Sequence, residues 1–264
     1  MSFATNYIEE WDRIILDWFQ NKDSLRSLID EKESLSIDHI PEPFYGNMEE
    51  CSIVIINLNP GIGLCDQCWS NQDQQGLFIN DVKNINSYST YVKDFPILPD
   101  QEKGLPKGPK PSMDWWKSRY AWINRILSHK GLKCTNKKPF AIELVPLHSK
   151  SFGVNPVKYV ATMKEKHSGI DLFKAIEYAI NASDAKMGLA IGKPIYTVLT
   201  RNGEYKDVCE KRQRDTKKRY YQVIENKGKT HRILCTWSIP SNNAPSKDFD
   251  AYEESLIKEF FSSK

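Results

Sequence analysis

The stretch IVIINLNPG, residues 53–61, runs from four β-branched residues directly into an Asn-Leu-Asn-Pro-Gly turn. A continuous apolar run of this length that ends in turn residues predicts a strand buried on both faces. We expect the strand to end before Pro60, because proline cannot donate to a sheet ladder. Loops that follow parallel strands form the edge at which open α/β folds bind ligands. The sequence therefore places the Asn59 side chain at a binding edge, although a plain turn explains the same residues about as well.

Three later apolar runs, at residues 140–145, 187–192 and 233–237, also predict buried strands. Apolar residues at helical spacing predict helices over residues 7–28, 115–127, 171–182, 193–200 and 249–261. This alternation predicts an α/β fold, a three-layer α/β/α arrangement in which helices cover both faces of a mostly parallel central sheet. The loops NLNPG, ELVPLHS and WSIPSNN follow three of the strands, so we expect them to meet at one edge and form one pocket.

Length and composition fit a single domain over residues 1–264, although length alone also permits two small domains. Within it we distinguish an N-terminal helical segment (1–40), a long loop insertion (69–113) and a basic section (201–232). Hydrophobic residues make up 40% of the chain, which excludes global disorder. The net charge is only +3, so a nucleic-acid site has to come from local clustering of positive charge.

Neither a signal peptide nor an apolar run of about 20 residues, the length of a membrane span, is visible in the sequence. We therefore expect a cytoplasmic protein with no membrane partner, in which the six cysteines are reduced. Cys65 and Cys68 form one CxxC pair, but a zinc or iron–sulfur site of this kind needs a second pair, and Cys134 and Cys209 are isolated. The sequence favours free thiols, with no metal and no cofactor.

The basic section contains eleven Lys or Arg against five Asp or Glu, with three tyrosines among them. Positive charge interleaved with aromatic rings is typical of a surface that follows a nucleic-acid backbone. Lys217, Lys218 and Arg219 form a continuous basic cluster in this section. A solvated hairpin accounts for the same composition about as well.

Three strand-ending motifs together resemble the uracil-DNA glycosylase superfamily. Residues 57–61, NLNPG, are similar to a first motif of the GxDPY or GxNPG kind, with Asn in the position where glycine is usual. Residues 143–145, ELV, look like a second motif in which an Asn reads the flipped base, with Glu143 in its place. Residues 237–241, WSIPS, resemble a relaxed form of a third motif of the HPSP kind, with Trp237 where His is usual.

The resemblance covers roughly residues 41–243 and implies a DNA glycosylase, which extrudes a base from the duplex and encloses it in a pocket. By the family pattern Asn59 would hold the attacking water, while His148, or a donor in the 238–243 loop, would stabilise the leaving base. The residues expected to contact the base are Glu143, Phe78 and Tyr45. Those expected to contact DNA are Gly61, Ser149, Lys150, Ser238, Ser241, Asn242, Lys217, Lys218 and Arg219.

Glu143 predicts a substrate other than plain uracil. An Asn offers both a donor and an acceptor, which suits N3–H and O4 of uracil, whereas a carboxylate only accepts, which suits an exocyclic amine or a hydroxyl. We therefore expect excision of a cytosine-type or otherwise modified base, as in bacterial defence against phage with modified DNA. The structural alternative is a buried ion pair of Glu143 with Lys150 or His148.

Two other functions are compatible with the same motifs. A glycosylase-like domain can bind nucleic acid without chemistry, since a fold does not fix an activity. A nucleotide-binding enzyme could use the same cleft for a free nucleotide. The main prediction remains a monomeric DNA glycosylase with DNA as its partner.

Overall fold

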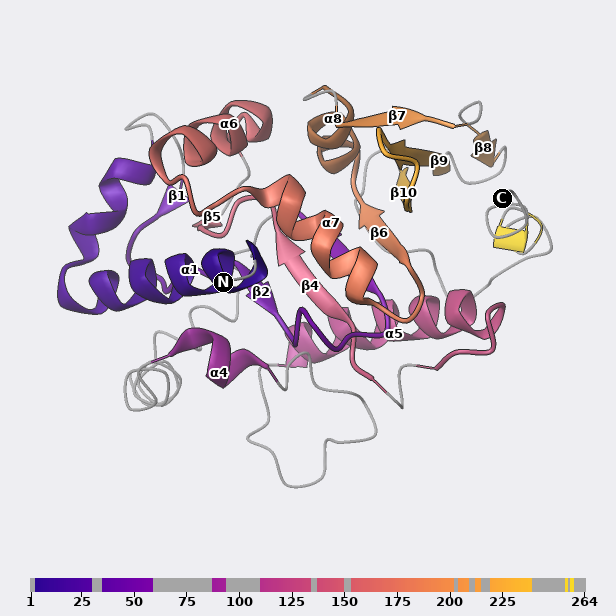
Figure 1. Cartoon of the computed structure of the whole chain (residues 1–264), viewed down its shortest axis with the longest axis horizontal. Helices are drawn as coiled ribbons and strands as arrows, with labels where there is room; N and C mark the ends of the chain where they lie inside the picture. The colour runs from indigo at the N-terminus through magenta and orange to yellow at the C-terminus, as the bar shows by residue number, and fades with distance from the viewer. Residues whose placement is uncertain are drawn as a thin grey trace.

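The computed structural model describes residues 3–29, 35–58, 87–93, 110–133, 137–149, 153–201, 204–208, 212–214, 219–238, 255 and 257–258. In this part of the chain, helices cover both faces of a mixed eight-stranded sheet (Figure 1). Its four inner strands are parallel and lie in the order β4 (Phe140–Glu143), β3 (Val54–Asn57), β6 (Met187–Ile191) and β10 (Arg232–Ser238). The predicted α/β class is confirmed, and so are the four predicted strands.

The outer strands of the sheet are antiparallel, so the sheet is parallel only in its inner part. Outside β4 lies β2 (Phe44–Tyr45), and outside β10 lies β9 (Arg219–Asn226). Two short strands, β7 (Tyr205–Asp207) and β8 (Arg212–Arg214), both pair with β9.

Helices on both faces explain why the inner strands read as continuous apolar runs. One face carries α1 (Phe3–Gln20), α6 (Pro156–Lys166), α7 (Leu172–Ala182) and α8 (Lys193–Arg201), and the other carries α5 (Lys110–Ser128). Alternate residues here serve the two faces: Val54 and Ile56 of β3 pack with the first group of helices, while Ile55 and the preceding Ile53 pack with α5. In Figure 1, α7 crosses in front of the inner strands. All four residues of β3 are therefore buried.

The N-terminal segment departs from the predicted continuous helix over residues 7–28. The helix α1 ends at Gln20, and a 3-10 helix, η1 (Lys22–Leu28), follows it. The break comes at Asn21, whose side chain accepts a hydrogen bond from the backbone N–H of Asp23 and so caps the new helix. The predicted apolar stripe is confirmed, because Tyr7, Trp11, Ile14, Ile15 and Trp18 are all buried.

Part of the predicted loop insertion over residues 69–113 is helical. A short helix, α4 (Tyr88–Val92), lies within it, and α5 already begins at Lys110. Asp12 of α1 holds the start of α4: its carboxylate accepts hydrogen bonds from the Ser89 N–H at 2.8 Å and from the Ser87 and Ser89 hydroxyls. Of the predicted C-terminal helix over residues 249–261, the structure describes residues 255, 257 and 258, which are helical.

The described residues of the basic section lie mainly in strands. The hairpin that the sequence left open is present, because β9 pairs with β10 along seven residue pairs, from Arg232↔Glu225 to Ser238↔Arg219. It is not a solvated hairpin, since four consecutive residues of β9, from Tyr221 to Ile224, are buried. Lys217 and Lys218 lie outside the described residues, so the structure places Arg219 alone of the predicted cluster.

Candidate functional site

The candidate site lies where β3 and β4 end. The chain passes from β3 to β4 on one side, and the later connection from β4 returns across β3 to β6 on the other side, so the direction of the connections reverses at β3. Open α/β sheets bind ligands at such a reversal, beyond the carboxyl ends of the strands. Asn57 and Glu143 are the last residues of β3 and β4, and they are direct register partners. The fold therefore fixes these two side chains next to each other on rigid strands.

Asn57 and Glu143 form a buried polar pair. The Asn57 amide donates from Nδ2 to Oε1 of Glu143 at 2.8 Å, and the two residues are 6% and 5% exposed. Oε2 of Glu143 is buried and has no hydrogen-bond partner among the described residues. Burial raises the pKa of Glu143 to about 8, against the opposing effects of Asn57 and Arg119. At neutral pH the neutral acid is therefore the major form.

A second carboxyl group, that of Glu42, has the opposite electrostatic character. Its Oε1 lies 3.5 Å from Nε2 of His148, and its backbone N–H donates to the Pro146 carbonyl. Burial on its own raises the pKa of Glu42, but His148 and the Tyr45 hydroxyl outweigh it, so the pKa lies below its usual value. The site thus holds one ionised and one neutral carboxyl group, a separation that often marks acid and base roles.

Residues from the N-terminal part of the chain lie next to His148. The two-residue strand β5 (His148–Ser149) pairs with β1 (Leu35–Ser36), which puts Ser36 opposite His148. The Ser36 hydroxyl is 2.8 Å from Nδ1 of His39, and the His39 and His148 ring centroids are 5.2 Å apart. His39 and Glu42 therefore both lie against the imidazole of His148.

Two more side chains complete the surroundings of the pair. Arg119 of α5 is buried, and burial lowers its pKa to about 9, while the nearby Glu143 acts in the opposite direction. The guanidinium is therefore still charged at neutral pH. Tyr45 packs edge-on against Trp116 with ring centroids 6.5 Å apart, and burial raises its pKa well above the usual value. Its hydroxyl consequently stays protonated.

A small cavity lies against the same strand end. Its volume is about 10 Å³, near the space that one water molecule needs. Polar and aromatic residues in its lining are Tyr7, Trp11, Glu143 and Tyr159. The cavity lies between Glu143 and the helices α1 and α6, which also contribute to its lining.

Comparison with protein-family models, curated proteins and solved structures found no match. The function therefore has to be inferred from the geometry and the sequence motifs. In the described ranges, no group of three or more His, Cys, Asp and Glu side chains is placed to hold a metal ion. No described helix has both the length and the apolar character needed to cross a membrane.

The structure brings four of the predicted site residues to one region. Glu143, His148, Ser149 and Tyr45 lie on β4, β5 and β2 near the same strand end. The predicted residues that fall outside the described part of the chain are Asn59, Gly61, Phe78, Lys150, Ser241, Asn242, Lys217 and Lys218. Cys65 and Cys68 also fall outside it.

The described part of the third motif begins at a buried aromatic ring. Trp237 lies between Tyr196 and Tyr220, with ring centroids at 5.1 and 5.8 Å, and is only 3% exposed. Trp237 belongs to the larger hydrophobic cluster, so it serves the core. Ser238 ends β10 opposite Arg219, which joins the basic section to the beginning of this motif.

Of the two partners considered for a buried pair with Glu143, Lys150 lies outside the described residues. The side chain that bonds Glu143 directly is Asn57, whereas the short contact of His148 is with Glu42. Sequence reasoning missed Asn57, Glu42 and Arg119 as site residues. A signal existed for Arg119, since it lies three residues after Trp116 on the inward stripe of the predicted helix. A buried cation at such a position requires compensation by polar or charged neighbours.

Proposed function

We propose that this protein is a DNA glycosylase of the uracil-DNA glycosylase kind, which flips a base out of DNA and hydrolyses its N-glycosidic bond. The substrate that we propose is a modified, cytosine-type base, and the biological role is defence against phage with modified DNA. The Asn57–Glu143 pair is the observation that supports this most directly. It puts two planar polar groups, both buried, at the ligand-binding edge of the sheet.

A buried pair of this kind suits the recognition of a base. A flipped base is read by hydrogen bonds to its polar edge inside an enclosed pocket. Amide and carboxyl groups offer the donors and acceptors that such an edge requires. Because both side chains come from strands in register, their positions are set by the sheet and not by a loop.

The surrounding charges suit the cleavage step. The base leaves with negative charge, which a buried guanidinium at Arg119 stabilises, and positive charge develops on the sugar. Glu42 is ionised and orients His148, which is the candidate donor to the leaving base. Asn59, two residues beyond the end of β3, keeps the role that the motif implies, which is to hold the attacking water.

The second candidate is a nucleic-acid-binding module without catalysis. It is favoured by one observation, that the first motif carries Asn59 and no Asp, and an Asn activates water more weakly than an Asp. In this case the pocket recognises an extruded base and releases the DNA unchanged.

Base release from a panel of duplexes tests the proposal. The panel contains uracil, hydroxymethylcytosine and glucosylated hydroxymethylcytosine, and the abasic product is detected by strand cleavage with alkali. We expect release of a modified cytosine, with little release of uracil. Release of uracil alone would defeat the proposed substrate class.

The variant Asn59→Ala separates the enzyme from the binding module. In the enzyme it abolishes base release and leaves DNA binding intact. The matched control is Asn124→Ala, at an exposed position of α5, which should leave base release unchanged. Binding of modified duplexes by the wild-type protein without any base release would favour the module instead.

A further inference from the structure

The two oxygens of the Glu143 carboxyl group have different surroundings. Oε1 accepts the hydrogen bond from Asn57 at 2.8 Å. Oε2 is equally removed from solvent, yet no described residue donates to it or accepts from it. A buried polar atom without a hydrogen bond costs free energy, so it is seldom kept unless it is used. Oε2 is therefore the oxygen of the Glu143 carboxyl group that has no hydrogen bond to a described residue and can still form one.

Titratable groups from the surrounding elements face Glu143. Those groups are Glu42, Arg119, His148, Tyr7, Tyr45 and Tyr88. The tyrosines are held neutral by burial. Burial of Glu143 and the negative charge of Glu42 favour its neutral form, whereas Arg119, His148 and the Asn57 hydrogen bond favour its ionised form. The first set prevails at neutral pH.

We propose that Glu143 binds its ligand as a neutral acid, whose Oε2–H donates a hydrogen bond to an acceptor atom on the ring of the bound base. Asn57 fixes which oxygen carries the proton, because Oε1 is already used as an acceptor. The ligand class is a pyrimidine that presents an acceptor to Oε2, such as the ring nitrogen N3 of a cytosine-type base. This inference rests on the proposed function for the identity of the ligand as a base.

This role differs from the one that the sequence alone suggested. An ionised Glu143 would accept from the exocyclic amine of cytosine, and that amine would determine recognition. A neutral Glu143 donates instead, so the ring nitrogen determines recognition and the amine matters less. The two roles make opposite predictions for base analogues that lack one of these groups.

Binding of analogue-containing duplexes distinguishes the two roles. One duplex carries 3-deazacytosine, which lacks the ring acceptor, and another carries 2-pyrimidinone, which keeps the acceptor but lacks the amine. At neutral pH we expect the 3-deaza duplex to bind about tenfold more weakly than its cytosine counterpart, the usual scale of one lost hydrogen bond. The amine-free duplex should bind nearly as well as cytosine. The reverse order of affinities would overturn the inference.

The variant Glu143→Gln provides a second, independent arm. A Gln amide imitates the neutral acid, because its carbonyl can accept from Asn57 and its NH₂ can donate in place of Oε2–H. We expect this variant to keep base binding and to lose the decline in affinity that the wild type shows as pH rises above about 8. The matched control Glu165→Gln, at an exposed position of α6, should keep that decline. Loss of binding by Glu143→Gln at neutral pH, with the fold intact, would contradict the inference.

Carbon NMR of glutamate-labelled wild-type protein separates this inference from the proposed function. The carboxyl signal assigned to Glu143 should titrate with a midpoint near 8, far from the other glutamates. A midpoint at the ordinary value overturns the neutral-acid role, whether or not the protein releases any base. A raised midpoint in a protein that binds the analogues but releases no base would leave the neutral-acid role standing and defeat the glycosylase.

Discussion

At the scale of single residues, the buried pair at the ends of β3 and β4 is the central feature of the candidate site. Asn57 and Glu143 are separated by 86 positions in the sequence and by 2.8 Å in the fold. Burial changes the chemistry of Glu143, because it raises the pKa of the carboxyl group to about 8. The same residue in solvent would be ionised at neutral pH.

The raised pKa of Glu143 predicts how stability depends on pH. A group whose pKa is higher in the folded state contributes stability that is fully present below its unfolded pKa of 4.5 and is lost as pH rises through about 8. Glu143→Gln has no proton to lose. We therefore expect the free energy of unfolding of the wild type to fall relative to that of the variant between pH 4.5 and 8, by a few kcal/mol, since each pKa unit corresponds to about 1.4 kcal/mol.

Urea unfolding across this pH range measures the difference. Glu165→Gln serves as the control, because the Glu165 side chain is exposed, and its stability curve should run parallel to that of the wild type. Parallel curves for the wild type and Glu143→Gln would show that Glu143 is ionised in the folded state.

Residues such as Glu143 could be singled out from the sequence, but their partners could not. A carboxylate at the end of an apolar strand is conspicuous because burying it is costly. Glu42 gave no comparable signal, since an acid between two prolines looks like an ordinary loop residue. Its role depends on the contact with His148, which only the fold creates.

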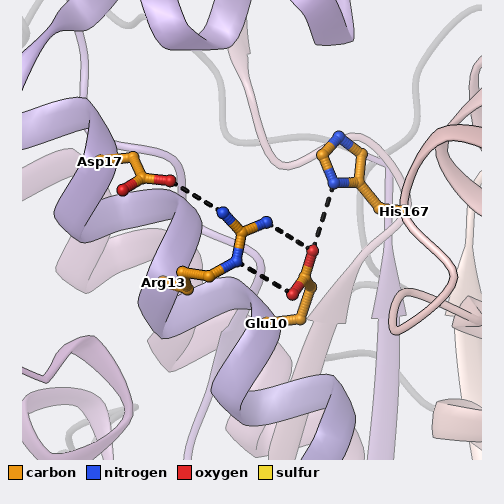
Figure 2. A network of polar contacts seen from close by, with 4 residues as sticks. All are labelled: Glu10, Arg13, Asp17 and His167. Atoms are coloured by element: carbon orange, nitrogen blue, oxygen red, sulfur yellow. Dashed lines mark hydrogen bonds and ion pairs between the residues drawn. The ribbon is translucent and has the colours of Figure 1, made fainter.

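At the scale of elements, α1 combines a deeply buried face with an exposed polar network. Trp11 is 1% exposed and lies in the larger hydrophobic cluster. On the outer side, Arg13 pairs with Glu10 at 2.7 Å and Asp17 at 2.9 Å, and His167 reaches Glu10 from beyond α6 (Figure 2). The Arg13 side chain is 54% exposed, so solvent screens both of its ion pairs.

Two substitutions in α1 should therefore have very different effects on stability. Trp11→Ala should lower the free energy of unfolding by about 3–5 kcal/mol, because it opens a cavity in the core. Arg13→Ala should lower it by less than about 1 kcal/mol, the usual limit for exposed ion pairs. Thermal or urea unfolding of both variants measures the contrast. Equal losses would mean that the network of Figure 2 is as important to the helix as its buried face.

The elements that the sequence predicted are those in which the apolar residues follow one clear pattern, a continuous run in a strand or a stripe at helical spacing. The four inner strands are almost wholly apolar, and α7 has a clear buried stripe. The helix α6 was not predicted, because only Tyr159, Val160 and Met163 of its eleven residues are buried and the rest are mostly polar. The strand β9 was hidden among basic residues, and its burial comes from pairing with β10.

At the scale of the whole molecule, the strand order is what the sequence could not provide. The apolar runs predicted four strands, but nothing in their composition says that β3 lies between β4 and β6. The position of the site follows from that order, because it brings the ends of β3 and β4 together at the reversal of connections. The outer strand β2 likewise depends on long-range pairing with β4, whereas β9 pairs with β10 in a local hairpin.

The position of the basic section predicts a salt effect on DNA binding. Arg219 lies opposite Ser238 of the third motif at the end of β10, and Lys217 and Lys218 directly precede Arg219 in the sequence. Neutralising these three residues to Gln should reduce the slope of log affinity against log salt by about 0.9 for each charge that contacts a phosphate.

Competition binding at several salt concentrations measures that slope. The matched control neutralises three exposed lysines on α6 and α7, namely Lys164, Lys166 and Lys174. It should leave the slope unchanged. Equal slopes for the wild type and the Lys217, Lys218 and Arg219 variant would remove this cluster from the DNA-binding surface.

The central place of β3 also has a consequence for synthesis on the ribosome. Both edges of this strand are used, but its partner β4 leaves the ribosome some 86 residues later, and β6 later still. At about 5–20 residues per second, the nascent Ile-Val-Ile-Ile segment waits for roughly 4 to 17 seconds with unpaired backbone groups on both sides. An apolar strand in that condition is a template for aggregation, so this segment is where a chaperone is most needed.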